Sequence, residues 1–291
     1  MYTKLDGVLS APITVFAENE EIDEAATREH INFLINHGIS ALITLAFTGE
    51  FASLSVEERK RVIKFTVEEV NGRVPVIAGI SDSSMRTVLE LGHFSAEVGA
   101  DAVFVLTPYL YSYTDREIVE FFEAVAAEIK LHIQIYNTPA AGRNLSPAII
   151  KELSAIDNIM SLKESNTSQI ADVLNLVGDK LTVFCGRDTY LLETLVLGGA
   201  GPTSVTGIVV PDRVVALYDA WMLGDIEKAR KLQYDIIPLT NLLVRRSYPA
   251  GIKAALDLIG LKGGRPRRPL TPYTDEERKP LRKELEALGV L

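Results

Sequence analysis

Eight short apolar runs, rich in Val, Ile and Leu, alternate with longer amphipathic stretches between Gly7 and Gly224. This alternation is typical of repeated βα units and predicts a parallel sheet. The runs show little alternation of apolar and polar residues, which indicates strands buried on both faces. The predicted strands are Val8–Phe16, Ser40–Ala46, Val74–Ala78, Ala102–Leu106, His132–Tyr136, Ile159–Leu162, Leu181–Cys185 and Thr203–Thr206.

Eight units in about 220 residues match the size of a (β/α)8 barrel, or TIM barrel. A doubly wound sheet usually has a Gly-rich first turn, whereas residues 17–21 contain no glycine. We therefore predict an α/β barrel over residues 1–224 and an all-helical C-terminal extension over residues 225–291. The helices expected in the extension are Asp225–Arg246, Gly251–Ile259 and Asp275–Leu288.

Local signals mark where the helices begin and end. Ser55 with Glu58 three residues later is a capping box, and Ser146 precedes a proline at the first helical position. Glycines that follow apolar-periodic stretches predict left-handed helix ends. These glycines are Gly38, Gly99 and Gly198.

Composition excludes several classes of function. The chain has 30 Lys and Arg against 39 Asp and Glu, a net charge of −9, which disfavours binding to nucleic acid. Cys185 is the only cysteine, so neither an intrachain disulfide nor a Cys-based zinc site is expected. No targeting segment and no apolar run of about 18 residues is present, so we expect no membrane span and a cytoplasmic protein. The arginine-containing segment 263–269 is expected to be a solvated loop rather than an anion site.

Reactive groups in such barrels lie at the carboxyl ends of the strands. Tyr109 comes just after the fourth apolar run, Tyr136 at the end of the fifth and Lys163 at the end of the sixth. Tyr109 and Tyr136 are 27 residues apart, as are Tyr136 and Lys163. Equal spacing predicts equal height in successive units. Because neighbouring strands lie about 4.8 Å apart, a phenol on one strand can approach an amine on the next.

Lys163 follows a buried strand and is expected to enter the barrel mouth. A lysine amine partly withdrawn from water can attack carbonyl groups, whereas the alternative is a lysine that simply points into solvent. Tyr136 is a candidate general acid and base beside it, although a lone tyrosine is more often a packed aromatic. The Thr48-Gly49 turn has backbone N–H groups and a hydroxyl suited to a carboxylate, although it can also be an ordinary βα turn.

Several motifs together resemble the dihydrodipicolinate synthase and N-acetylneuraminate lyase family. They cover nearly the whole chain. The motifs are Thr48-Gly49-Glu50, Tyr136-Asn137-x-Pro139, Leu162-Lys163-Glu164, Gly186-x-Asp188, the glycine-rich run 198–201 and Pro249-Ala250-Gly251-Ile252-Lys253.

The resemblance implies a cofactor-free lyase, usually a homotetramer, in which a lysine forms a Schiff base with pyruvate or another 2-keto acid. It assigns the Schiff base to Lys163, proton transfer to Tyr136 and the keto-acid carboxylate to Thr48, while Glu50 is expected to hold the turn. Gly186, Asp188 and Thr206 are expected at the distal part of the substrate. Phe47, Gly49 and Tyr109 complete the candidate substrate-binding set.

Three departures from the family pattern bear on the second substrate. Phe47, Leu110 and Ala141 stand where synthases of dihydrodipicolinate carry a hydroxyl, a phenol and an arginine. We therefore expect an aldolase for a 2-keto-3-deoxy sugar acid, with 4-hydroxy-tetrahydrodipicolinate synthase as the alternative. Tyr111 and Arg143 are possible substitutes for the missing phenol and arginine. A non-catalytic paralogue that binds a keto acid is a third possibility, which retention of both Lys163 and Tyr136 disfavours.

The positions of the histidines disfavour a metal-dependent mechanism, and the position of the glycine-rich run disfavours a pyridoxal phosphate mechanism. His30, His37 and His93 lie in helical stretches, and His132 opens a strand and so lies away from the strand ends. The glycine-rich run 198–201 precedes the eighth strand, at the end of the barrel opposite to the expected site.

Overall fold

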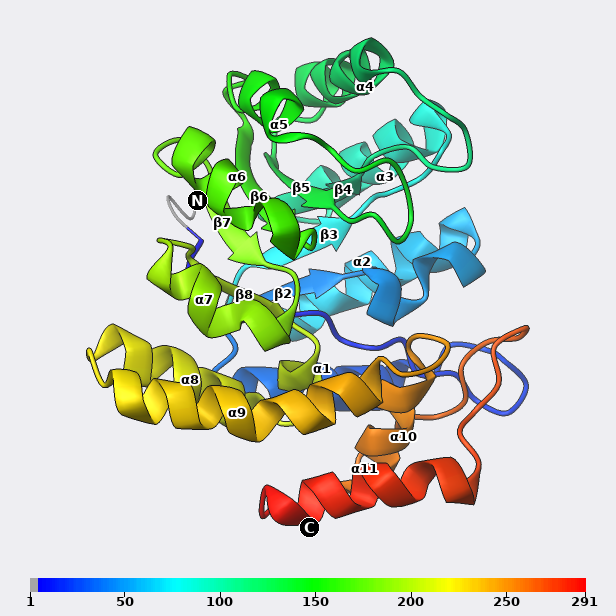
Figure 1. Cartoon of the computed structure of the whole chain (residues 1–291). Helices are drawn as coiled ribbons and strands as arrows, with labels where there is room; N and C mark the ends of the chain where they lie inside the picture. Colours follow the sequence, from blue (N-terminus) through cyan, green and yellow to red (C-terminus); the bar gives the residue numbers. More distant parts are fainter. Residues whose placement is uncertain (1–4) are drawn as a thin grey trace.

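The computed structural model describes residues 5–291 as a closed barrel of eight parallel strands in the order β1 to β8, ringed by helices (Figure 1). The predicted TIM barrel is therefore confirmed. Its strands are β1 (Leu9–Ser10), β2 (Ala41–Thr44), β3 (Val76–Gly79), β4 (Ala102–Leu106), β5 (His132–Asn137), β6 (Ile159–Glu164), β7 (Thr182–Cys185) and β8 (Gly201–Ser204).

Helices follow the strands in alternation, and the helix ends agree with the local sequence signals. Ser55 and Glu58 form the predicted capping box, and Ser146 caps the helix that has Pro147 in its first turn. Gly38, Gly99 and Gly198 all have positive φ, as predicted. The barrel helices are α1 (Glu24–Asn36), α2 (Val56–Val70), α3 (Met85–Glu97), α4 (Asp115–Glu128), α5 (Pro147–Leu153), α6 (Ile170–Val177), α7 (Leu191–Val196) and α8 (Pro211–Met222).

The first strand is much shorter than predicted, because it ends at Ser10 rather than Phe16. Pro12 has no backbone N–H to give to a sheet. Beyond it, the N–H groups of Ile13 and Val15 donate to His30 Nδ1 and Thr27 Oγ1, both on α1. Helix α1 therefore takes the backbone hydrogen bonds that the predicted strand would have given to its neighbours.

The C-terminal extension consists of α9 (Ile226–Leu243), α10 (Ala250–Leu258) and α11 (Asp275–Ala287), close to the predicted ranges. Figure 1 shows α9 beside α8, with α10 and α11 below the barrel. An apolar cluster joins Ile13 and Ile208 of the barrel to Leu239 and Ile252 of the extension. The extension thus shares a core with the barrel, and the division into domains at residue 224 stays a prediction.

The prediction of a solvated loop over residues 263–269 is wrong for Arg267. Its guanidinium is 15% exposed and pairs with Glu58, and its backbone N–H donates to Glu50. Arg265 and Arg268 remain exposed. All three arginines of segment 263–269 pair with acidic residues of the barrel, Arg265 with Glu18, Arg267 with Glu58 and Arg268 with Glu20, but only the Arg267 guanidinium is largely withdrawn from solvent.

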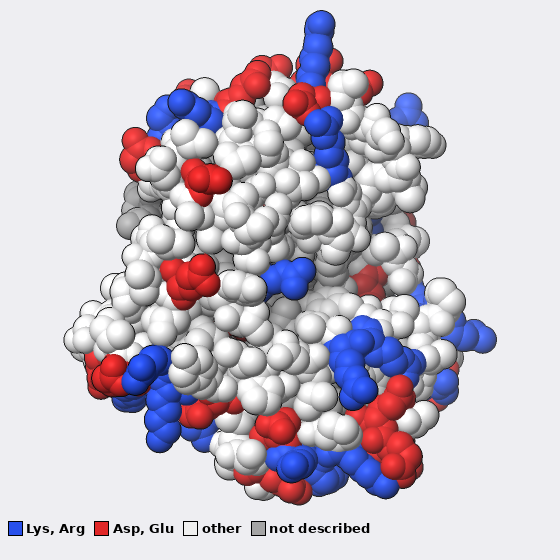
Figure 2. All heavy atoms as spheres, in the orientation of Figure 1, with Lys and Arg blue, Asp and Glu red and all other residues white. Residues whose placement is uncertain are grey.

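Charged side chains are unevenly distributed over the face seen in Figure 2. The middle of this face is hollowed and mostly uncharged, with a basic side chain in the hollow, and charged groups gather toward its upper and lower edges. Among residues 5–291, no helix is both long enough and apolar enough to span a membrane.

Candidate active site

Tyr136 and Lys163 lie side by side at the carboxyl ends of β5 and β6. Their Cα atoms are register partners across the two strands, so the equal height predicted for them is confirmed. The same prediction is wrong for Tyr109, because Leu106 is the residue of β4 that pairs with Tyr136. Tyr109 lies three residues beyond its strand, in the following loop.

A cavity of about 350 Å³, here called the Lys163 chamber, opens above these strand ends. Of the candidate site residues, Phe47, Thr48, Tyr136, Lys163, Gly186 and Asp188 line it. Gly49, Tyr109 and Thr206 do not. The chamber lies at the face where barrel enzymes carry their reactive groups.

The Lys163 amine lies against aromatic rings rather than against an acid. Its Nζ is 4.3 Å from the centroid of the Tyr136 ring and 5.8 Å from that of Phe104, and its side chain is buried. None of the carboxylates in residues 5–291 forms an ion pair with it. An amine without a fixed counter-ion is free to react with a carbonyl carbon.

The turn after β2 brings Thr48 to the chamber and is fixed by contacts on its other side, chiefly to α10. Residues Phe47–Gly49 form a short 3-10 helix that ends at Glu50 in the left-handed conformation, with φ of 54°. Glu50 Oε1 lies 2.6 Å from Lys253 Nζ on α10, and both side chains are 1% exposed. Gly49 contributes through its carbonyl, which accepts a hydrogen bond from Thr14. Glu50 thus has the structural role expected from the sequence.

Asp188 is fully buried at the wall of the chamber. Its Oδ2 accepts hydrogen bonds from Ser204 Oγ and from the backbone N–H groups of Val205 and Thr206, at 3.0, 2.9 and 2.6 Å. Its Oδ1 has no partner in the described structure, and burial raises the pKa of the carboxyl. Thr206 therefore acts on the site through Asp188 rather than by lining the chamber.

Gly186 is required by the close approach of two strand ends. A Cβ atom there would lie 2.0 Å from Ser165 Oγ and 2.9 Å from the carbonyl oxygen of Glu164. Glu164 itself points away from the chamber and binds Asn137 and Gln169, and burial raises its pKa.

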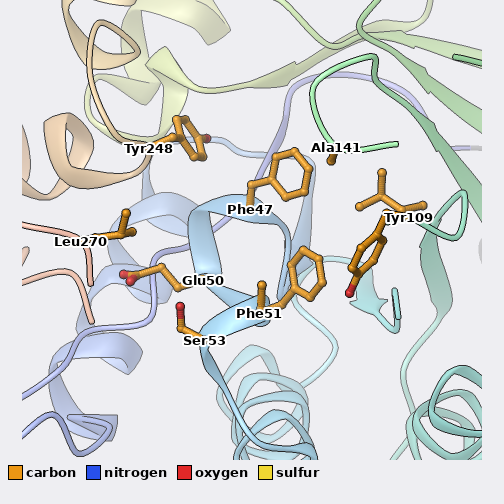
Figure 3. A pocket seen from close by; sticks show the side chains of 10 residues that line it. Phe47, Glu50, Phe51, Ser53, Tyr109, Ala141, Tyr248 and Leu270 are labelled. Atoms are coloured by element: carbon orange, nitrogen blue, oxygen red, sulfur yellow. The ribbon is translucent and has the colours of Figure 1, made fainter. Parts of the chain in front are cut away.

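Tyr109 belongs to a second, apolar cavity of about 340 Å³ behind Phe47. Figure 3 shows the rings of Phe47, Phe51 and Tyr109 grouped on one side of the turn after β2, with Glu50 directed away from them. The Phe47 ring lies 5.4 Å from that of Tyr136 and 6.0 Å from that of Phe51, so Phe47 forms the wall between the two cavities.

The two suggested substitutes for missing groups do not reach the Lys163 chamber. Leu110 and Tyr111 are 86% and 74% exposed in the loop after β4. Arg143 is held outside by Asp115 and by the carbonyl oxygen of Tyr113. Ala141 lines the apolar cavity instead.

The contribution of the C-terminal extension to the chamber was not predicted from the sequence. Tyr248, in the turn between α9 and α10, lines the chamber, and its Oη lies 2.7 Å from Thr48 Oγ1. Only the position of Tyr248, directly before the family-like segment 249–253, offered any signal. The other chamber residues from the extension are Thr240, Asn241 and Val244.

Residues 5–291 contain no cluster of three or more His, Cys, Asp or Glu side chains arranged to hold a metal ion. The expectation that the reaction needs no cofactor stays a prediction.

Comparison with known proteins places this geometry in a family. The model of the dihydrodipicolinate synthetase family matches residues 4–288. The chain belongs to the dihydrodipicolinate synthetase family. Membership agrees with the resemblance seen in the sequence and makes the protein an enzyme of the class I aldolase and lyase type.

Curated relatives of similar length share the same name. The 4-hydroxy-tetrahydrodipicolinate synthase of Methanocaldococcus jannaschii is 38% identical, over 98% of this chain and 99% of that protein. The enzyme of the same name from Acetivibrio thermocellus is 36% identical, over 97% of this chain and 96% of that protein. The relatives thus favour the reaction that the sequence analysis held as its alternative, and they give no specific support to the sugar-acid aldolase.

Solved structures agree in fold. A dihydrodipicolinate synthase structure superposes with a TM-score of 0.94 at 38% identity, covering 99% of this chain and all of that one. YagE of E. coli K12, a prophage protein of the dihydrodipicolinic acid synthase family solved in complex with pyruvate, superposes with a TM-score of 0.95 at 29% identity. The alignment covers 98% of this chain and 99% of YagE.

Proposed function

We propose that the protein is an imine-forming lyase that takes pyruvate, or a closely related 2-keto acid, as its first substrate. The observation that carries the proposal is the buried Lys163 amine, without an acidic partner, beside the Tyr136 ring on the neighbouring strand. The pyruvate complex of YagE supports a keto acid as the ligand of such a site.

In this proposal Lys163 attacks the C2 carbonyl carbon of the keto acid, and the carbonyl oxygen leaves as water. Tyr136 takes a C3 proton from the imine to give an enamine, whose C3 attacks the carbonyl carbon of an aldehyde. Water then adds to the resulting imine, which releases the product and restores the Lys163 amine. Tyr136 carries protons to the departing and newly formed hydroxyl oxygens. Thr48 donates to the carboxylate, and Phe47 closes the chamber toward the apolar cavity.

For the second substrate, the curated relatives favour aspartate semialdehyde and hence 4-hydroxy-tetrahydrodipicolinate synthesis. We take this condensation as the leading reaction. A specific observation favours a second candidate, which is cleavage of a 2-keto-3-deoxy sugar acid. Arg143 is engaged with Asp115, so no arginine is free in this loop to bind the carboxylate of the aldehyde. Asp188, whose buried Oδ1 has no hydrogen-bond partner in the described structure, lies in the wall of the chamber where a substrate hydroxyl would be bound.

Borohydride reduction in the presence of pyruvate tests the first half of the proposal. We expect irreversible inactivation and a label on the peptide that contains Lys163. The variant Lys163→Met should take up no label, whereas Lys130→Met, at an exposed site, should be labelled normally. A label on another lysine, or on none, would refute the mechanism.

Parallel assays with purified protein decide the second half. One assay measures condensation of pyruvate with aspartate semialdehyde, and the other measures release of pyruvate from a 2-keto-3-deoxy sugar acid. Efficient condensation without cleavage supports the leading reaction, and the opposite result supports the second candidate. A homotetramer, which the family resemblance implies, and a cytoplasmic location also remain proposals, which light scattering and cell fractionation can test.

A further inference from the structure

The C-terminal extension places a phenol inside the Lys163 chamber. Tyr248 is half-buried between α9 and α10 and lines both the chamber and the apolar cavity behind Phe47. Figure 3 shows it across the turn after β2 from Tyr109, with Phe47 between them. No role of Tyr248 follows from the barrel alone, because the residue lies outside it.

The hydroxyl groups of Tyr248 and Thr48 form an isolated pair. Their oxygens lie 2.7 Å apart, and neither has another hydrogen-bond partner in the described part of the chain. Each hydroxyl carries one proton to donate, and their mutual bond uses only one of the two. One O–H is therefore left over at the wall of the chamber.

The remaining O–H is a donor rather than a base. Burial raises the pKa of the Tyr248 phenol, and the nearby Tyr136 and Asp188 raise it further by disfavouring a second negative charge. Tyr248 thus stays protonated in the physiological pH range. A protonated hydroxyl pair at the mouth of a barrel is suited to bind an anionic oxygen.

We propose that Tyr248 and Thr48 act as one unit that donates a hydrogen bond to the carboxylate of the 2-keto acid held at Lys163. The C-terminal extension thereby supplies a substrate-binding residue to the barrel. This inference rests on the proposed imine chemistry and adds to it a residue that recognises the carboxylate.

Trapping by borohydride at a series of pyruvate concentrations tests the inference. In Tyr248→Phe, the concentration that gives half-maximal labelling should rise about 10- to 100-fold, the loss expected for a hydrogen bond to a charged group. With methyl pyruvate, whose ester is uncharged, the concentration that gives half-maximal labelling of the variant should rise only about two- to fivefold. A purely structural defect would affect both compounds equally and would overturn the inference.

Two further variants make the test independent of folding defects. Thr48→Val removes the other hydroxyl of the pair, so it should reproduce the selective loss for pyruvate, and the double variant should be no worse than either single one. The control is Tyr273→Phe, which removes a phenol of the same extension outside the chamber and should bind pyruvate normally. If the wild-type protein is labelled but neither pair variant is weakened, the inference fails while the imine mechanism stands. If the wild-type protein is not labelled, both fail.

Discussion

Lys163 Nζ lies 4.3 Å from the centre of the Tyr136 ring, and the two residues are direct partners in the register of β5 and β6. The position of the Lys163 amine relative to the Tyr136 ring is therefore fixed by two adjacent strands of the barrel. No mobile loop is needed to bring them together. Positions on strands are held more precisely than positions on loops, as a reaction with several proton transfers requires.

The hydroxyl of Tyr136 should matter far more than its ring. We expect Tyr136→Phe to lower turnover by about 10²- to 10⁴-fold, because a positioned proton donor is lost. The fold should persist, since a phenylalanine keeps the packing against Phe104 and Phe47. Steady-state kinetics and circular dichroism measure the two effects. Tyr109→Phe is the matched control, and an equal loss of turnover there would contradict the placement of Tyr109 outside the chamber.

Removing one partner of the buried pair of Lys253 and Glu50 should be strongly destabilising. Lys253→Met leaves the Glu50 carboxylate buried without a cation, and we expect the free energy of unfolding to fall by about 3–5 kcal/mol. Adding Glu50→Gln should recover part of the loss, because no uncompensated charge then remains. Lys262→Met removes an exposed lysine and should cost under about 1 kcal/mol. Denaturant unfolding measures all three, and equal losses for both lysines would contradict the prediction.

Arg267 should stabilise the protein in a way that depends on pH. Its hydrogen bonds lower the pKa of Glu58 from 4.5 to about 2. A carboxyl with a lowered pKa in the folded state adds stability above its unfolded pKa and loses it as the pH falls toward the folded value. The stability difference between the wild type and Arg267→Met should therefore be largest above pH 4.5 and shrink between pH 4.5 and about 2. Urea titrations across this range test it. A constant difference would mean that only the bonds of Arg267 to backbone carbonyls contribute.

Gly186 should not tolerate a side chain. In Gly186→Ala the new methyl group would meet Ser165 and the backbone of Glu164, and we expect a loss of about 1–3 kcal/mol together with weaker trapping of pyruvate. Gly49→Ala is the control, because its Cβ would find contacts of 3.6 and 3.7 Å, which are ordinary. Thermal unfolding compares them, and equal stability of the two variants would contradict the steric argument.

The sequence predicted the barrel and the Tyr136–Lys163 pair because both depend on local strand periodicity and on where each strand ends. The equal spacing wrongly predicted that Tyr109 lies at the same height as Tyr136. The strand before it ends at Leu106, and counting residues cannot separate a strand from the loop that follows.

The parts that were not predicted depend on contacts between distant segments. Apart from the position of Tyr248 directly before the family-like segment 249–253, nothing in the sequence indicates that the extension returns over the barrel mouth. Arg267 was predicted to be solvated because its neighbours in the sequence are glycine, proline and arginine. In the structure its guanidinium binds Glu58 and its backbone N–H donates to Glu50, both in the barrel. Such pairings arise from how helices pack, which periodicity does not encode.

The double attachment of the turn after β2 to the later part of the chain has a consequence for evolution. Thr48 bonds to Tyr248, and Glu50 pairs with Lys253, so two neighbouring residues of the barrel each need a particular partner in the extension. Recombination that exchanged the extension alone would leave a buried carboxylate without its cation and a threonine without its phenol. We therefore expect these two segments to be inherited together, even where the barrel between them diverges.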